Sequence, residues 1–416
     1  MTQEAVGHKL PALKLSPDEE RAVHDEVWEI IYHTLECEDA FNRNGGRVDP
    51  KTWKHITTND NLRVYKHRKK HGQPSQSSEY SRETFNTDCI TAPELLSTRD
   101  VNVSSGNWRI SSISDGAASG SSGTSESSLG DDSTVPELLC VGYIEGDVND
   151  MNYGAYDGDD LAWKIRSAYM KDKLAAARFL ARIETPTDEE PFRFLGIKWF
   201  MGDYPALVSS FISKRDTLVI EAIGTATDHR GMPYSYYVLH DFKHPKVPEA
   251  VAPDIIRIRF SFCFISRQVR PDRIGVYSKG RVDVGGDLLT SVGLMITGIS
   301  VASTANAVET SYNKKLVWMM ERQREQRLQI QNSQTPAQAC HSCQKQAGGL
   351  LARGLIDCEA CGHAFCSKCS VIKKLVVDTR AKELSLRSLP FCFGCVLKAK
   401  QLSPLEVARA TIVQRP

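Results

Sequence analysis

Four Cys-x-x-Cys pairs lie near the C-terminal end of this chain, and they leave few ways for that segment to fold. The pairs are Cys340/Cys343, Cys358/Cys361, Cys366/Cys369 and Cys392/Cys395. Two residues between cysteines allow a tight turn to bring both thiolates to one tetrahedral zinc ion, so four pairs supply two complete sites. A segment of roughly 60 residues has too small a core to fold alone. We therefore expect metal binding to supply its folding free energy.

The gaps between the pairs predict how they share two ions. Only four residues separate Cys361 from Cys366, too few for the second and third pairs to hold one ion together. We expect two interleaved sets, which are Cys340, Cys343, Cys366 and Cys369 for the first zinc and Cys358, Cys361, Cys392 and Cys395 for the second. Four thiolates saturate each ion and leave no position for water, so both zinc ions are predicted to be structural.

The rest of the composition is that of an ordinary folded protein. Apolar residues make up 41% of the 416 residues and charged residues 25%, so disorder of the whole chain does not fit. The formal charge is +1, which gives no global field that would attract nucleic acid. Residues 1–14 contain charges and no continuous apolar segment, so we expect no secretory signal. A reducing, cytoplasmic location favours metal-bound over disulfide-bonded cysteines.

Residues 73–134 are predicted to be a mostly disordered insertion. Within it, Ser111–Ser133 contains ten serines and four glycines and few large apolar side chains. Such a segment cannot bury enough surface to offset the entropy lost on ordering. No function can be assigned to it from the sequence.

Sequence periodicity on either side of the insertion predicts helices and strands. The segment Ser16-Pro17-Asp18-Glu19 has the residues of a helix N-terminus, and we expect a helix from Pro17 to about Cys37. Apolar residues at helical spacing predict a second helix from Asp159 to Ile183. Strands are predicted at Leu62–Lys66, Leu138–Ile144, Phe192–Phe200, Thr217–Ala226, Tyr234–Phe242, Ile255–Ser266 and Arg273–Val284.

A long last helix is predicted from Leu288 to Met320. Its first part, Leu288–Val308, has 21 residues without a charge, which is long enough for a membrane span. Several Ser, Thr and Asn side chains would then have to lie in lipid, so we expect a helix packed on protein instead. Strands bracketed by a first and a last helix predict an α+β fold in which an antiparallel sheet wraps a long helix.

The cysteine-rich segment resembles a FYVE zinc finger over about Ala339–Ala399. The resemblance rests on the string Cys358-Glu-Ala-Cys361-Gly362-His-Ala-Phe365-Cys366-Ser-Lys-Cys369-Ser370. FYVE domains that bind phosphatidylinositol 3-phosphate carry a basic run, Arg-Arg/Lys-His-His-Cys-Arg, around the third cysteine. Here the corresponding positions include Asp357 and Glu359, and carboxylates repel a phosphate. Phosphoinositide recognition is therefore expected to be weakened.

Membrane contact by this finger stays open despite those acidic residues. The resemblance places an apolar membrane-inserting loop near Leu350, and nearby basic residues could meet anionic lipid headgroups. The membrane-docking candidates are Leu350, Leu351, Arg353, Lys373 and Lys374. Contact with a partner protein and a purely structural finger are the alternatives.

The larger part of the chain resembles a START domain, through the order of several short motifs. These include Trp53, Leu62-Arg-Val-Tyr65, Leu138-Leu-Cys-Val-Gly142, Arg215-Asp216, His244-Pro245-Lys-Val-Pro248, Ile256-Arg257 and Gly285. The resemblance implies a helix-grip fold, in which a sheet curves around the last helix and encloses a tunnel for one lipid or sterol. From alternation and helical spacing, the candidates for side chains facing this cavity are Phe260, Phe262, Met295 and Ile299.

The sequence therefore predicts a START-like lipid-binding domain over 17–327, with 73–134 as its insertion. A linker at 328–339, a FYVE-like finger at 340–399 and a tail at 400–416 follow. The expected function is nonenzymatic lipid or sterol binding, in the cytoplasm or peripherally on endosomal or other membranes. The alternative is a protein-interaction adaptor whose START-like fold is filled by side chains. Sequence motifs of hydrolases, P-loop enzymes and metalloproteases are absent, so no catalytic residue is assigned.

Overall fold

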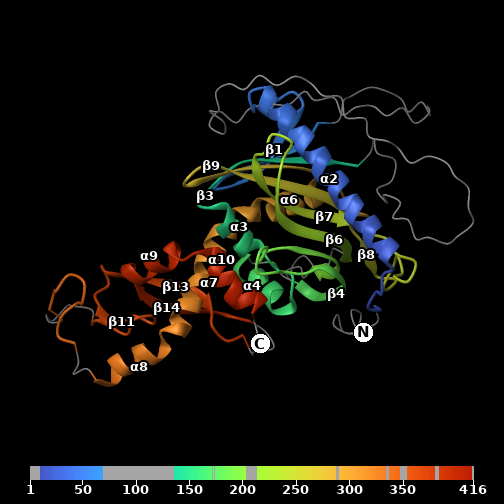
Figure 1. The fold of residues 1–416 in the computed structure, drawn as a ribbon. Helices are drawn as coiled ribbons and strands as arrows, with labels where there is room; N and C mark the ends of the chain where they lie inside the picture. The colour runs from blue at the N-terminus through green and yellow to red at the C-terminus, as the bar shows by residue number, and fades with distance from the viewer. Residues whose placement is uncertain are drawn as a thin grey trace, which may run out of the picture.

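The computed structural model describes residues 10–68, 135–170, 172, 174–202, 213–286, 290–333, 337–346, 354–379 and 384–414. The predicted insertion, 73–134, lies outside the described residues. The described part is a mixed α+β structure with one large antiparallel sheet and a small cysteine-rich domain, here called the finger (residues 337–402) (Figure 1).

The sheet contains ten strands in the described part of the chain. Along the sheet the order is β1 (Trp53–Asn59), β2 (Asn61–His67), β3 (Glu137–Glu145), β10 (Arg273–Asp283), β9 (Arg259–Arg270), β7 (Pro233–Asp241), β6 (Lys214–Thr227), β5 (Phe194–Gly202) and β4 (Leu174–Glu184). Neighbours along this path are antiparallel, and the short strand β8 (Ile255–Arg257) pairs in parallel with β6. Because β3 pairs with both β2 and β10, it joins the first hairpin to the rest of the sheet.

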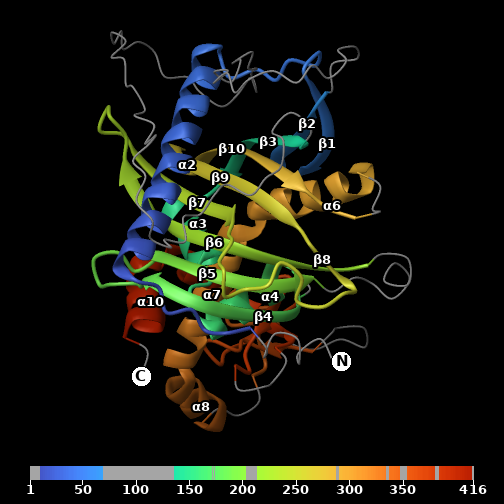
Figure 2. The same ribbon diagram turned by 90° about the vertical axis from the view of Figure 1, so that its right-hand side faces the viewer.

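Helix α2 (Pro17–Arg43) covers one face of the sheet (Figure 2). It begins as predicted, since Ser16 accepts a hydrogen bond from the Glu19 N–H and the Glu19 side chain accepts one from the Ser16 N–H. Val27 and Ile31 are among its buried residues, in a core formed with β5, β6, β7 and β9. The apolar stripe thus fixes which side of the helix meets the sheet.

Four helices lie on the opposite face, here called the inner face. They are α3 (Val148–Ala155), α4 (Asp160–Met170), α6 (Thr290–Ala302) and α7 (Ala307–Arg322). Their apolar side chains share one core with β2, β3, β9 and β10. The predicted long last helix is present as α6 and α7, joined by a 3₁₀ turn at Ser303–Asn306.

The predicted helix Asp159–Ile183 is wrong in its second half. Helix α4 ends at Met170, and Leu174–Glu184 forms strand β4 against β5. The β4 sequence is rich in Ala, Leu and Arg, which favour helix by only a few tenths of a kcal/mol per residue. Pairing along the edge of the sheet, with three register shifts, overrides that small preference.

The finger follows helix α8 (Arg324–Ser333), which occupies the first part of the stretch expected to be a linker. The finger contains two small antiparallel pairs, β11 (Ile356–Asp357) with β12 (Ala364–Phe365) and β13 (Ser370–Val376) with β14 (Leu386–Cys392). Helix α9 (Phe393–Gln401) comes next. The chain then returns to the large domain through α10 (Pro404–Ala408) and a π-helical turn at Arg409–Val413.

Candidate metal centres and the inner face of the sheet

Eight cysteines form two compact groups in the finger. The first group is Cys340, Cys343, Cys366 and Cys369, and the second is Cys358, Cys361, Cys392 and Cys395. Within each group the four Sγ atoms lie within 4.8 Å of one another. The first pair therefore meets the third and the second meets the fourth, which is the arrangement that the gap lengths predicted.

The distances between the sulfur atoms fit a tetrahedral thiolate site. Four sulfurs at about 2.3 Å from a zinc ion lie about 3.8 Å from one another. Cys343 Sγ lies 3.7 Å from Cys366 Sγ. In the second group the Cys392 N–H donates to Cys358 Sγ and the Cys395 N–H donates to Cys392 Sγ, both at 3.3 Å. Such bonds stabilise the thiolate form that binds metal, so each group could hold one structural ion.

A turn of the same shape begins each group. The Gln344 N–H donates to the Cys340 carbonyl at 2.8 Å, and the Gly362 N–H donates to the Cys358 carbonyl at 2.8 Å. Both donors have left-handed backbone, with φ of 57° at Gln344 and 76° at Gly362. Glycine adopts this conformation readily and glutamine rarely. The sequence therefore signals the second turn more clearly than the first.

The finger packs directly on helix α7 of the large domain. Leu316, Met319 and Met320 of α7 share a buried core with the finger residues Leu375 and Phe391. Because α7 also packs on α3, one helix contributes to the cores of both domains. The finger is therefore fixed against the large domain.

Helix α8 lies on the turn that begins the second cysteine group. The Arg327 guanidinium donates to the Glu359 carbonyl and lies 3.3 Å from Glu359 Oε2. A Cβ atom on Gly362 would lie 3.0 Å from the Arg327 carbonyl oxygen, so the backbones are close. Glu359, which the sequence analysis placed where a phosphate would be repelled, thus binds an arginine of the same chain.

The membrane-docking candidates differ in their surroundings. Lys373 Nζ forms an ion pair with Glu309 of α7 at 2.6 Å, so this side chain takes part in the contact between the domains. Lys374 is exposed. Leu350, Leu351 and Arg353 lie outside the described residues.

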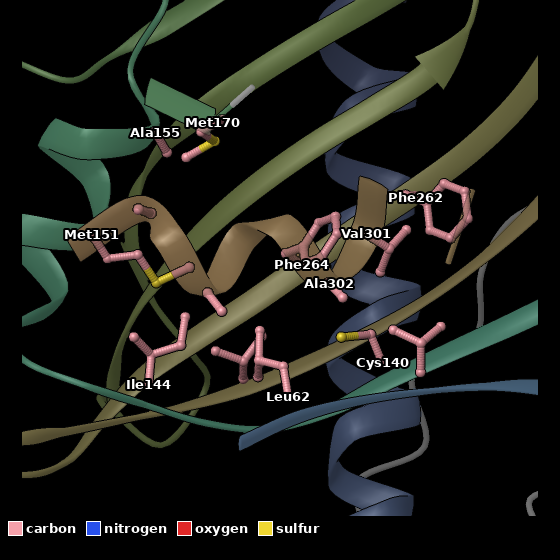
Figure 3. Close-up of a cluster of buried hydrophobic side chains, with 14 of the residues drawn as sticks. Leu62, Cys140, Ile144, Met151, Ala155, Met170, Phe262, Phe264, Val301 and Ala302 are labelled. Carbon is pink, nitrogen blue, oxygen red and sulfur yellow. The ribbon is translucent and has the colours of Figure 1, made fainter. Parts of the chain in front are cut away.

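The cavity candidates fall into two groups. Phe262 of β9 is buried in the inner-face core and Phe260 is partly buried against it. Met295 and Ile299 of α6 are 55% and 56% exposed, so they point away from that core. Instead, α6 buries Leu294, Val301 and Ala302 against the sheet. Figure 3 shows Val301 and Ala302 among the side chains of Phe262, Phe264 and Cys140.

Helix α6 is apolar on its exposed side as well. Its thirteen residues contain no charge, and its large exposed apolar side chains form one row at helical spacing, flanked by the exposed Ser291 and Ser300. This row, here called the α6 row, is Val292, Met295, Ile296 and Ile299, each more than one third exposed. The helical stretch Thr290–Arg322 is long and apolar enough to cross a membrane by length and composition alone, and 44% of its most apolar window is buried in the protein.

A buried group of charges on the inner face gave no signal in the sequence. Lys198 Nζ lies 2.6 Å from Asp157 Oδ1 and 2.9 Å from Glu221 Oε1, and all three side chains are almost fully buried. Arg166 lies 3.6 Å from Asp157 and 2.8 Å from Asp172. Burial and the neighbouring Asp157 carboxylate raise the pKa of Glu221 well above its usual value. The raised pKa favours the protonated, neutral form of Glu221, in which Asp157 and Asp172 balance the charges of Lys198 and Arg166.

His240 and Asp241 are both buried in strand β7. His240 lies 3.0 Å from Glu26 Oε1 of α2 and 2.8 Å from Ser261 Oγ of β9. Burial raises the pKa of Asp241 to about 6. Helix α2 covers this face of the sheet, and Glu26 supplies a partner for the His240 imidazole.

No family model matches the chain, and no curated protein matches it. Among solved structures, it is similar to human StAR-related lipid transfer protein 5, with 10% identity over 68% of this chain and 97% of that one, and a TM-score of 0.36. It is also similar to human STARD10, with 11% identity over 69% of this chain and 83% of that one, and a TM-score of 0.36. A STAR-related lipid transfer protein from Xanthomonas axonopodis is similar too, with 11% identity over 62% of this chain and 96% of that one, and a TM-score of 0.30. Similarity this distant leaves the function to be argued from the residues of this chain.

Proposed function

We propose that this chain is a START-like lipid- or sterol-binding protein that carries a structural, FYVE-like finger with two zinc ions. The observation that carries this proposal is the α6 row. Large apolar side chains are normally enclosed by protein or lipid, yet the described structure buries only one side of α6 and leaves this row exposed. An apolar guest beside α6 would cover the other side.

Burial of the α6 row is the physical driving force for such binding. Met295 and Ile299 are more than half exposed, and Val292 and Ile296 more than one third. Removing apolar surface from water yields about 25 cal/mol per Å². An acyl chain or a sterol ring system presents enough apolar surface to cover the α6 row and gain this free energy, whereas a small polar metabolite does not. We therefore assign the ligand to the lipid class.

The finger supports a second part of the proposal, which is contact with a membrane. Lys374 is exposed on β13, next to Ile372, which is 54% exposed. Basic and apolar side chains together favour binding to anionic lipid surfaces. Asp357 and Glu359 argue against a strong phosphoinositide site. We place the protein in the cytoplasm, with peripheral contact to endosomal or other membranes, and assign it no catalysis.

An adaptor function is the second candidate, and one observation favours it. Phe262 and Phe264 are buried with Val301 and Ala302, so side chains fill part of the inner face. If that filling is complete, the α6 row would bind a partner protein instead.

Native mass spectrometry of the purified full-length protein tests these alternatives. Lipid binding predicts an adduct of a few hundred daltons that disappears on denaturation, together with two zinc ions. Two zinc ions without an adduct, after incubation with mixed lipids, would favour the adaptor. Fewer than two metal ions would contradict the finger.

A further inference from the structure

Helix α7 takes part in two cores at once. At its N-terminal end, Ala307 and Val308 are buried in the inner-face core. A Cβ atom on Gly154 of α3 would lie 1.7 Å from the Ala307 carbonyl oxygen, so the backbones of α3 and α7 are in contact. At its C-terminal end, Leu316 and Met319 are buried against the finger. Loss of the finger would expose these side chains to water.

Lys315 joins the two cores through polar contacts. Its side chain is fully buried, and its Nζ lies 2.7 Å from Asp150 Oδ1 of α3. The same ammonium donates to the carbonyls of Lys400 and Leu402, at 2.8 and 2.9 Å, where α9 ends. Two of its three acceptors therefore belong to the C-terminal side of the finger. A buried charge that loses acceptors is costly, so this contact makes α7 sensitive to the position of α9.

Two further contacts hold the finger on either side of this lysine. The Val376 N–H of β13 donates to the Tyr169 hydroxyl of α4 at 3.0 Å. Beyond α9, Val407 and Ala408 are buried with Tyr153 and Phe192 of the large domain. The finger is thus attached to the large domain both through its own strands and through the segment that follows it.

The finger has little besides metal to keep it folded. Its strands β11 and β12 have two residues each, and four of the residues in its shared core are cysteines of the metal groups. Small domains of this kind unfold when the metal is removed. Unfolding would withdraw the acceptors of Lys315 and the apolar partners of Leu316 and Met319.

We propose that zinc occupancy of the finger controls the order of helix α7 and, through the 3₁₀ turn at Ser303–Asn306, the position of α6. Metal loss would loosen α7 and α3 and weaken lipid binding at the α6 row. The part that concerns lipid rests on the proposed function, whereas the part that concerns α7 does not. The finger would then regulate the large domain from within the same chain.

Hydrogen exchange measured by mass spectrometry on the full chain tests the first part. The zinc-loaded protein is compared with protein stripped by EDTA under reducing conditions and with stripped protein reloaded with zinc. We expect amide protection in α7 and α3 to fall about tenfold or more on stripping and to recover on reloading. Helix α2, which packs on β6, β7, β9 and β10 on the opposite face of the sheet, is the internal control and should not change. Loss of protection confined to residues 337–402 would overturn the proposal.

A variant with all eight cysteines intact separates the contact from metal binding. Lys315→Met with Asp150→Asn removes the buried pair without leaving one charge alone. The zinc-loaded double variant should retain two ions but show reduced protection in α3, and unchanged protection would argue against this contact. Tyr169→Phe, which removes one acceptor from the same interface, gives a milder test.

Lipid retention by native mass spectrometry tests the second part. An adduct present with zinc and absent after stripping would support regulation, and an adduct retained equally in both states would overturn it. If neither state holds an adduct, the proposed lipid function fails, while the exchange experiment still decides whether zinc orders α7.

Discussion

The finger and the inner face of the sheet both bring distant segments together, but with different chemistry. In the finger, eight identical side chains in four Cys-x-x-Cys pairs meet in two groups. On the inner face, Lys198 meets Asp157 and Glu221, which are residues of other types from separate parts of the chain. The ligands of this finger are all cysteines in Cys-x-x-Cys pairs, and so they leave a pattern in the sequence. A buried group of ions needs only balanced charges, whatever the spacing of its residues, and so it leaves no pattern in the sequence.

The largest difference between the regions should appear when one buried cysteine is replaced in each. Cys358 of the finger and Cys263 of the sheet are both 1% exposed. Cys358→Ser should reduce the bound zinc from two ions to one and remove a site whose metal binding is worth about 10 kcal/mol. Cys263→Ser should keep both ions and cost about 1–3 kcal/mol. Native mass spectrometry and thermal unfolding measure the two quantities, and two retained ions in Cys358→Ser would contradict the assignment.

Next in size is the effect of removing the lysine from the buried ion group. Lys198→Met leaves Asp157 without its nearest partner and should destabilise the large domain by about 3–5 kcal/mol. Adding Asp157→Asn should recover part of this loss, because no uncompensated charge then remains. Urea unfolding of the single and double variants measures the difference. A single variant within about 0.5 kcal/mol of the parent would mean that the group is not needed.

The protonation of Glu221 should make the free energy of unfolding change with pH. Its pKa is raised in the folded state by burial first and by Asp157 second, so the folded protein binds this proton more tightly than the unfolded chain. That stabilisation is complete below the unfolded pKa near 4.5 and is lost as pH rises toward the folded pKa. Relative to Glu221→Gln, the parent should lose up to about 1.4 kcal/mol per pH unit above that point. Parallel curves for both proteins from pH 5 to 8 would refute a raised pKa.

A smaller effect is expected where helix α8 meets the finger. None of the described side chains at 324–330 of α8 is buried, so Arg327 is its main attachment. Arg327→Ala should reduce local stability by about 1 kcal/mol and increase hydrogen exchange in α8 without loss of zinc. The charge exchange Arg327→Glu with Glu359→Arg should restore part of the protection. No change in α8 exchange in Arg327→Ala would show that this contact contributes nothing.

The smallest effect on stability is expected at the α6 row. Met295→Ser with Ile299→Ser should change unfolding by about 0.5 kcal/mol or less, because both side chains are exposed. The matched buried change, Val301→Ser on the same helix, should cost about 2–3 kcal/mol. If the α6 row binds lipid, the double variant should lose the adduct while it remains folded. An adduct kept at parent levels would move the ligand elsewhere.

These two regions also show how far sequence reasoning reaches. The interleaved cysteine groups followed from gap lengths, and the start of α2 followed from its capping residues. Strand β4 could not be predicted from the sequence, because its residues favour a helix and pairing with β5 holds them in a strand. Met295 and Ile299 lie on α6 as expected, but on its exposed side, away from the inner-face core. Local pattern identified elements and ligands, whereas burial depended on contacts far apart in the chain.

The shared helix α7 has a consequence for how the protein is made. Leu402, whose carbonyl accepts from Lys315, lies 87 residues further along the chain. At about 5–20 residues per second, a ribosome needs roughly 4–17 s to add this length. During that interval α7 exists without the finger, with Leu316, Met319 and Met320 uncovered. The core that α7 shares with the finger can therefore form only after the chain has been synthesised through the end of the finger.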